Sequence, residues 1–161
     1  MIRMVRSFLF LFVAFLAPAT WAASTVEGVY KANGQDAKLA FALAYPSEAH
    51  LGKPTTRLVF SEQDASAEKR PDISALFGKF GSSFVVLLMK DGDSYTVIGS
   101  DFGHQGLKHA GASAIGLVDA KDVKITDGRI SGRLITAPDS DISDQPVVVD
   151  LKFDVALSKA K

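Results

Sequence analysis

Cysteine is absent from the whole 161-residue chain. No disulfide can form, so the folded protein has to be stabilised by packing without a covalent cross-link. No thiol is available as a nucleophile or as a metal ligand. A lipid anchor of the bacterial lipoprotein kind, which needs a cysteine directly after the signal, is excluded as well.

Long apolar runs are also absent. The longest, Phe8–Ala17, is much shorter than the roughly 20 residues that a membrane-spanning helix needs. Arg3 and Arg6 precede this run, which is the pattern of a cleaved secretory signal peptide. Small side chains permit cleavage after Ala19 or after Ala22, and we favour Ala22. Because an exported chain without cysteine is typical of the bacterial envelope, we expect a soluble periplasmic protein with no stable membrane anchor after cleavage.

A surplus of positive charge is missing too. Without residues 1–22, which contain Arg3 and Arg6 but no acid, the remaining 139 residues carry 16 basic and 18 acidic side chains, a net charge of −2. Phosphate backbones bind to concentrated Lys and Arg, so this balance argues against a nucleic-acid partner. A chain of this length is expected to form a single domain, residues 23–161, around one apolar core.

The clearest pattern that the chain does contain is the alternation in Val147–Leu157. Every second residue of this run is apolar, and Asp150, Lys152 and Asp154 lie between them. A period of two predicts a strand with one face on a core and the other in water.

Three Asx-Gly pairs, which begin at Asn33, Asp91 and Asp127, separate β-prone runs and supply the positive φ angles of tight hairpin turns. About nine strands are expected from these turns and from the alternation. They are Val26–Lys31, Lys38–Tyr45, Thr56–Ser61, Phe84–Lys90, Tyr95–Ser100, Ala112–Val118, Val123–Thr126, Arg129–Thr136 and Val147–Leu157. Short strands joined by hairpins predict an all-β antiparallel sandwich, with a lipocalin-like β-barrel as the alternative.

One segment departs from the β pattern. Apolar residues recur at helical spacing from Ile73 to Phe80 after a proline, so we predict one short helix over Pro71–Lys79. We expect this helix to cover an open end of the β core. Small and large residues alternate from Leu39 to Tyr45, which predicts that both faces of that strand are covered.

Potential metal ligands gather in the glycine-rich stretch between Gly99 and Gly111. Asp101, His104 and His109 lie in this stretch, and carboxylate and imidazole are ordinary metal ligands. If the loop curls, the three side chains leave an open coordination position for water or substrate. The alternative is a structural loop whose histidines cap backbone groups or face solvent.

Other catalytic signatures are weak. Asp139–Asp144 alternates carboxylates as calcium loops do, but it lacks the turn glycine and the late Glu of an EF-hand and is interpreted as a solvated acidic loop. Ser113 lacks the second glycine of a nucleophile elbow. The glycine spacings match neither a phosphate-binding loop nor a dinucleotide fingerprint. We therefore predict no catalytic residue, and the cofactor, if any, is unknown.

The order Tyr95, Asp101-x-x-His104, Lys108-His109-x-Gly111-x-Ser113 resembles the opening of a bacterial exported lipocalin-like family that carries isoprenoid lipids. In that family the motif opens the mature protein and its histidines are further apart, whereas here it lies in mid-chain. The resemblance implies an eight-stranded barrel with a lipid in its lumen.

These patterns together favour an exported binding or interaction module without enzymatic activity. Its partner would be an unknown envelope component or a small apolar ligand. Two alternatives remain open. One is a β-barrel carrier of a lipid or isoprenoid, and the other is a metal-binding protein or hydrolase that uses Asp101, His104 and His109.

Overall fold

The computed structural model describes residues 23–109 and 111–159, so the predicted signal peptide, residues 1–22, lies outside the described residues. The described chain forms two antiparallel sheets and one short helix, which confirms the all-β sandwich. Sheet A contains, in spatial order, β2 (Gln35–Ala37), β1 (Thr25–Ala32), β11 (Gln145–Ala156), β9 (Arg129–Thr136) and β8 (Val118–Thr126), with β10 (Asp141–Ile142) paired to β11. Sheet B contains β3 (Phe41–His50), β4 (Lys53–Ser61), β5 (Ser83–Asp91), β6 (Ser94–Gly103) and β7 (Ala112–Ala114) in chain order, and α1 (Pro71–Leu76) lies between β4 and β5 in sequence.

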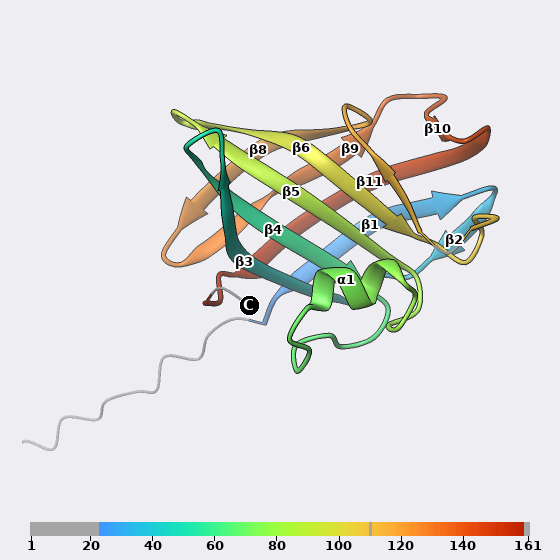
Figure 1. Cartoon of the computed structure of the whole chain (residues 1–161), viewed down its shortest axis with the longest axis horizontal. Coiled ribbons are helices and arrows are strands. Elements are labelled where there is room, and N and C mark those ends of the chain that lie inside the picture. The colour runs from blue at the N-terminus through green and yellow to red at the C-terminus, as the bar shows by residue number, and fades with distance from the viewer. Residues whose placement is uncertain (1–22, 110, 160–161) are drawn as a thin grey trace, which may run out of the picture.

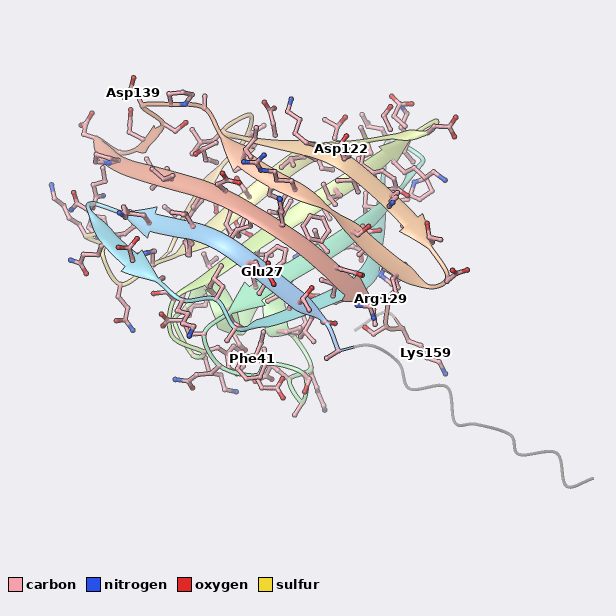
Figure 2. The ribbon with its side chains drawn as sticks, turned by 180° about the vertical axis from the view of Figure 1, so that it is seen from behind. Glu27, Phe41, Asp122, Arg129, Asp139 and Lys159 are labelled. Carbon is pink, nitrogen blue, oxygen red and sulfur yellow. The ribbon has the colours of Figure 1, made fainter. Side chains whose placement is uncertain are left out.

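The chain begins in sheet A, makes all of sheet B and then returns to sheet A. β1 and β11 lie side by side, with Thr25 opposite Asp154 and Ala32 opposite Val147. Sheet B is in front in Figure 1, and the view from behind in Figure 2 has β1, β11 and β9 in front. Each sheet keeps two edge strands, so the described strands form a sandwich and not the alternative lipocalin-like barrel.

Side chains fill the space between the two sheets. Tyr30, Phe60, Phe84 and Phe102 are at most 1% exposed, and their neighbouring ring centroids lie 5.0 to 6.5 Å apart. The Tyr30 hydroxyl donates a 2.9 Å hydrogen bond to the carbonyl oxygen of Ser83, which ties sheet A to sheet B. The lumen that a lipid carrier of the lipocalin kind would need is therefore occupied by side chains in the described part of the chain.

The alternation predicted for the last strand is confirmed in β11. Its inward residues are all buried, namely Val147, Val149, Leu151, Phe153 and Val155. On the opposite face, Asp150 receives two hydrogen bonds from Arg133 of β9, and Arg129 Nε donates to the Asp154 carboxylate. The outer face of sheet A is thus charged and solvated, as the sequence predicted.

Two of the three predicted hairpin turns have the expected geometry. Asn33–Gly34 and Asp127–Gly128 each place both central residues at positive φ. The third turn is centred one residue later than predicted, because Asp91 pairs with Ser94 and the central pair is Gly92–Asp93. Gly92 takes the positive φ of this turn, at 61°.

Two further turns and a strand break were not predicted. Leu51–Gly52 and Ser143–Asp144 also have positive φ at both residues, and the second of these turns joins β10 to β11 within the predicted acidic loop. The run predicted as one strand, Lys38–Tyr45, spans the crossing from sheet A to sheet B. Residues 35–37 pair with β1 as β2, and β3 begins only at Phe41. The described residues accordingly form eleven strands instead of about nine.

Residues 62–82, called the cover segment below, lie on the outer face of sheet B and include α1. The helix is shorter than predicted and contacts β4, β5 and β6 near one end of the sheet (Figure 1). Ala65, Ala75 and Phe80 of the cover segment form a second buried cluster with Val59 and Val85. The cover segment therefore forms a third layer on the outer face of sheet B, where the sequence predicted that the helix would cover an open end of the β core.

The predicted apolar stripe of the helix is only partly buried. Phe80 is 8% exposed, but Ile73 and Phe77 are 41% and 71% exposed. The reason is that α1 buries the side that carries Pro71, Asp72 and Ala75, and ends at Leu76, before Phe77. Within the described residues, no helix has the length and apolar character needed to cross a bilayer.

Gly28 in β1 allows the first and last long strands to pair closely. Its φ is +129°, and a Cβ at this position would lie 2.0 Å from the carbonyl oxygen of Asp150 on β11. We expect Gly28→Ala to lower the free energy of unfolding by more than about 2 kcal/mol, because both the backbone angle and the strand pairing would have to change.

The measurement is urea unfolding followed by circular dichroism, because the single tryptophan, Trp21, precedes the expected cleavage point. Gly99→Ala is the matched control, since its Cβ would meet no atom within 4 Å and its φ is ordinary. The strand pairing described here would be wrong if both variants unfolded at the same urea concentration as the unchanged protein.

Candidate functional site

The structure places the three predicted metal ligands in different environments. Asp101 lies opposite Val85 in the β5–β6 pair and faces outward, where it accepts a 2.6 Å hydrogen bond from the Ser113 hydroxyl. His104 lies inward and is 3% exposed, and His109 is exposed. Among the described residues no three His, Asp or Glu side chains gather in a way that would hold a metal ion.

His104 has a structural environment in the loop after β6. Its Nδ1 accepts a 2.9 Å hydrogen bond from the Gly106 backbone N–H, and its ring meets the Tyr30 ring edge-on at 4.7 Å. A Cβ on Gly106 would lie 2.5 Å from the Ala32 carbonyl oxygen, so this glycine permits the loop to pack against β1. These contacts match the alternative interpretation, a loop in which one histidine caps a backbone group and another faces solvent. The metal site stays a prediction without a geometric cluster to support it.

A different cluster of polar side chains lies where the cover segment meets sheet B. Tyr45 of β3 and Arg57 of β4 are direct cross-strand partners on the outer face. Asp72, in the first turn of α1, accepts a hydrogen bond from Arg57 Nη1, and its side chain is only 8% exposed. This ion pair joins the cover segment to the centre of sheet B.

The Arg57–Asp72 pair forms part of the lining of a cavity of about 410 Å³. Tyr45 is 5% exposed, and Arg57 Nε is buried without a hydrogen-bond partner in the described structure. Burial, and then the neighbouring Asp72 carboxylate, raises the pKa of Tyr45 to about 12. The hydroxyl is therefore protonated at neutral pH and lies beside the Asp72 carboxylate.

Charged side chains from two elements surround the same cavity. Lys69 and Arg70 of the cover segment are exposed, and Arg70 Nε lies 3.8 Å from Asp72 Oδ1. Pro46, Ser47 and Glu48 of β3 form the opposite wall. We call this space the Arg57 cavity. It joins a buried polar floor to a rim that carries charges of both signs.

A second cavity, of about 300 Å³, lies on the other side of α1. Leu76, Gly103, His104 and Leu107 are among its lining residues. His104 Nε2 is buried and has no hydrogen-bond partner in the described structure, and Lys108 is the charged residue of this lining, whereas the Arg57 cavity has five charged residues. The Arg57 cavity is therefore the better candidate for recognition of a polar ligand.

The sequence contained only an indirect signal for the Arg57 cavity. An arginine next to the buried residues Leu58, Val59 and Phe60 is unusual, because a charge in a covered strand needs a partner. The partner, Asp72, lies 15 positions away in sequence, and the loop that returns it to β4 has no pattern from which the pairing follows.

Comparisons with protein-family models, with curated proteins and with solved structures find no match to this chain.

The pH dependence of stability tests the environment of His104. Burial lowers its pKa, an effect partly offset by the Tyr30 backbone and by the negative charges of Glu62 and Asp36. The unfolded chain therefore binds a proton at His104 more readily than the folded chain does. The stability that the neutral, buried ring contributes is complete above the ordinary histidine pKa of about 6.5 and is lost as the pH falls below that value. We expect the free energy of unfolding to decrease from pH 8 to pH 5.5.

His104→Asn removes the titrating ring and retains an acceptor near the Gly106 N–H, so it should reduce this decrease. His109→Asn, at an exposed position, is the control and should leave it unchanged. Urea unfolding at both pH values provides the measurement. Equal pH dependence in His104→Asn and the unchanged protein would contradict the structural role given to His104.

Proposed function

We propose that the protein is an exported binding module of the bacterial envelope, without enzymatic activity, and that it binds a small molecule in the Arg57 cavity. Export is supported by Arg3 and Arg6 followed by the apolar run Phe8–Ala17. Cleavage after Ala22 would leave every described strand whole, since β1 begins at Thr25.

The observation that carries the binding proposal is the Arg57 cavity itself, whose lining combines the Arg57–Asp72 ion pair with the exposed charges of Lys69 and Arg70. Its volume of about 410 Å³ is in the range of small-molecule sites.

The chemistry of the floor suits holding a ligand better than transforming one. A general base works best when its pKa lies near the operating pH, whereas the pKa of Tyr45 is raised to about 12. Asp72 is held by Arg57 and is not available to accept a proton from a substrate without loss of the ion pair. The residues present therefore supply fixed donors and charge.

Export is tested by expressing the full chain in a bacterial host and separating the periplasm from the cytoplasm. We expect the periplasmic protein to begin at Ala23, as read by mass spectrometry of the intact protein. Ala22→Phe places a bulky side chain at the −1 position and should move cleavage to Ala19 or block it. Full-length protein confined to the cytoplasm would contradict export.

Binding in the cavity is tested by thermal unfolding with a panel of small anionic, neutral and cationic compounds. At ten times its dissociation constant a ligand stabilises by about 1.4 kcal/mol, which raises the unfolding temperature by roughly 3 to 6 °C for a domain of this size. We expect at least one class to produce this shift.

Ser47→Trp fills the cavity and should abolish the shift. Thr96→Trp adds the same side chain to an exposed position of β6 outside the cavity and should retain it. The proposal fails if no class shifts the unchanged protein, or if the shift survives in Ser47→Trp.

A further inference from the structure

We propose that the open edge of β1 is an interaction surface, which takes an extended segment of another protein as an additional strand of sheet A. The open edge is the stretch Thr25–Val29 on the side of β1 that faces away from β11. The added strand is antiparallel to β1, has apolar side chains toward the core and carries a basic residue opposite Glu27. This surface is separate from the Arg57 cavity, and the inference does not depend on that cavity.

The first argument is the early end of β2. β1 pairs with β11 over all of its eight residues, but it pairs with β2 only from Tyr30 to Ala32. After Ala37 the chain leaves sheet A and crosses to sheet B. Among the described strands none lies beside Thr25–Val29 on this side, and Figure 2 shows β1 as the border of the sheet there.

The open edge presents main-chain groups that another polypeptide strand matches. The residues of a strand point their N–H and C=O groups alternately to the two neighbouring strands. The Asn33 N–H donates to the Pro146 carbonyl oxygen, so the odd-numbered residues of β1 face β11 and the even-numbered ones face away from it. Val26 and Gly28 therefore direct their main-chain groups to the open edge. Gly28 has no side chain, so its exposed surface is main-chain surface that a partner can reach.

A groove of about 280 Å³ lies beside the same edge, and its lining includes Val26, Gly28, Leu39 and Leu151. Gly28 is directly opposite the buried Leu151 and, like it, lies on the inward face of sheet A, so the groove opens where β1 lacks a side chain. A large apolar side chain on the added strand, opposite Gly28, would cover this glycine and extend toward Leu39. Because direct cross-strand neighbours pack on the same face, the groove selects an apolar residue at that position.

The other edges of the two sheets are protected against pairing. β8 has a bulge at Asp122, whose φ is +52°, between two lysines. β3 contains Pro46 and a register shift, and part of its edge is bonded to the C-terminal segment. β7 has only three residues. Bulges, lysines, proline and short strands are the usual means of preventing edge pairing, and none of them occurs in Thr25–Val29.

The charges of the edge favour a different chain over a second copy of this one. Full antiparallel overlap of Thr25–Val29 with itself would place two Glu27 carboxylates opposite each other, which destabilises a strand pair. Glu27 is exposed, and Lys152 of β11 lies opposite it on the paired side. A basic residue on the added strand would place Glu27 between two positive charges. The edge is therefore complementary to a segment with a basic residue between two apolar ones.

The probe is a synthetic pentapeptide, acetyl-Thr-Phe-Lys-Val-Thr-amide, which runs in the same direction as β2. In this register its phenylalanine lies opposite Gly28, its lysine opposite Glu27 and its valine opposite Val26. NMR titration of the isotope-labelled mature protein with millimolar peptide measures binding. We expect saturable movement of the Val26 and Gly28 amide signals, while the amide signal of Gly92, in the β5–β6 turn of sheet B, stays in place.

Methylation of main-chain nitrogens in the peptide tests the strand pairing. The peptide residues opposite Val26 and Gly28 exchange hydrogen bonds with β1, whereas the lysine N–H points away from β1. Methylation at phenylalanine and valine should therefore weaken binding at least about fivefold, and methylation at lysine should leave it unchanged. A peptide of the order Phe-Thr-Lys-Thr-Val turns its apolar side chains outward and should also bind at least about fivefold more weakly.

Glu27→Lys tests the charge that selects the partner. This variant should bind the lysine peptide more weakly than the unchanged protein does, and should prefer a peptide with glutamate in place of lysine. Asp119→Lys makes the same change at an exposed position of β8, and it should bind as the unchanged protein does. Ser47→Trp, which fills the Arg57 cavity, should also leave peptide binding unchanged, so that failure of this inference and failure of the proposed function are distinguishable.

The inference is overturned if the Val26 and Gly28 signals do not move, or if methylation at phenylalanine and valine weakens binding no more than methylation at lysine. It is also overturned if Glu27→Lys keeps the preference for the lysine peptide. Sedimentation equilibrium of the protein alone should show a monomer. A dimer whose formation moves the same two amide signals would show that a second copy occupies the edge, and would overturn the assignment to another protein.

Discussion

The aromatic packing between the two sheets is the interaction on which the rest of the structure depends. With no cysteine, no disulfide joins sheet A to sheet B, so their separation is fixed by buried rings such as Phe84 and Phe102, whose centroids lie 5.0 Å apart. The Tyr30 hydroxyl adds a direct hydrogen bond from β1 to Ser83 at the start of β5. Dense packing of this kind tolerates few changes in volume, and it holds the strands as rigid platforms.

The candidate site uses this rigidity through β4, which is covered on both faces. Leu58 and Phe60 point into the core between the sheets, while Arg57 and Val59 point outward to the cover segment. Arg57 is therefore fixed by its neighbours in the chain, and Asp72 is fixed by α1. The two sheets differ in consequence. Sheet A has a solvated outer face with paired charges, and sheet B has a covered face with one charged pair at the edge of a cavity.

Local patterns predicted most of the fold because strands and turns are encoded by neighbouring residues. The period of two in β11 and the turn at Asn33–Gly34 needed no information from elsewhere in the chain. Predictions failed where the outcome depended on distant contacts. The crossing after Ala37 and the exposure of Phe77 depend on which surface the next segment meets, and the sequence around them does not specify that surface.

The candidate site was hidden for the same reason. Asp101, His104 and His109 are close in sequence, but strand alternation separates the first two onto opposite faces. Tyr45, Arg57 and Asp72 are far apart in sequence and meet only after the hairpin and the cover segment have formed. Proximity along the chain therefore does not show which polar side chains meet, and a single arginine within a buried strand was the local sign of the Arg57 cavity.

The most direct test of ligand binding in the Arg57 cavity is the NMR signal of the Arg57 guanidinium during titration with the compound that raises the unfolding temperature most. Binding is expected to move this signal, because Arg57 lines the cavity, while the signal of Arg133 on the other sheet, bonded to Asp150, stays in place. An Arg57 signal that does not move, or that moves no more than that of Arg133, would contradict it.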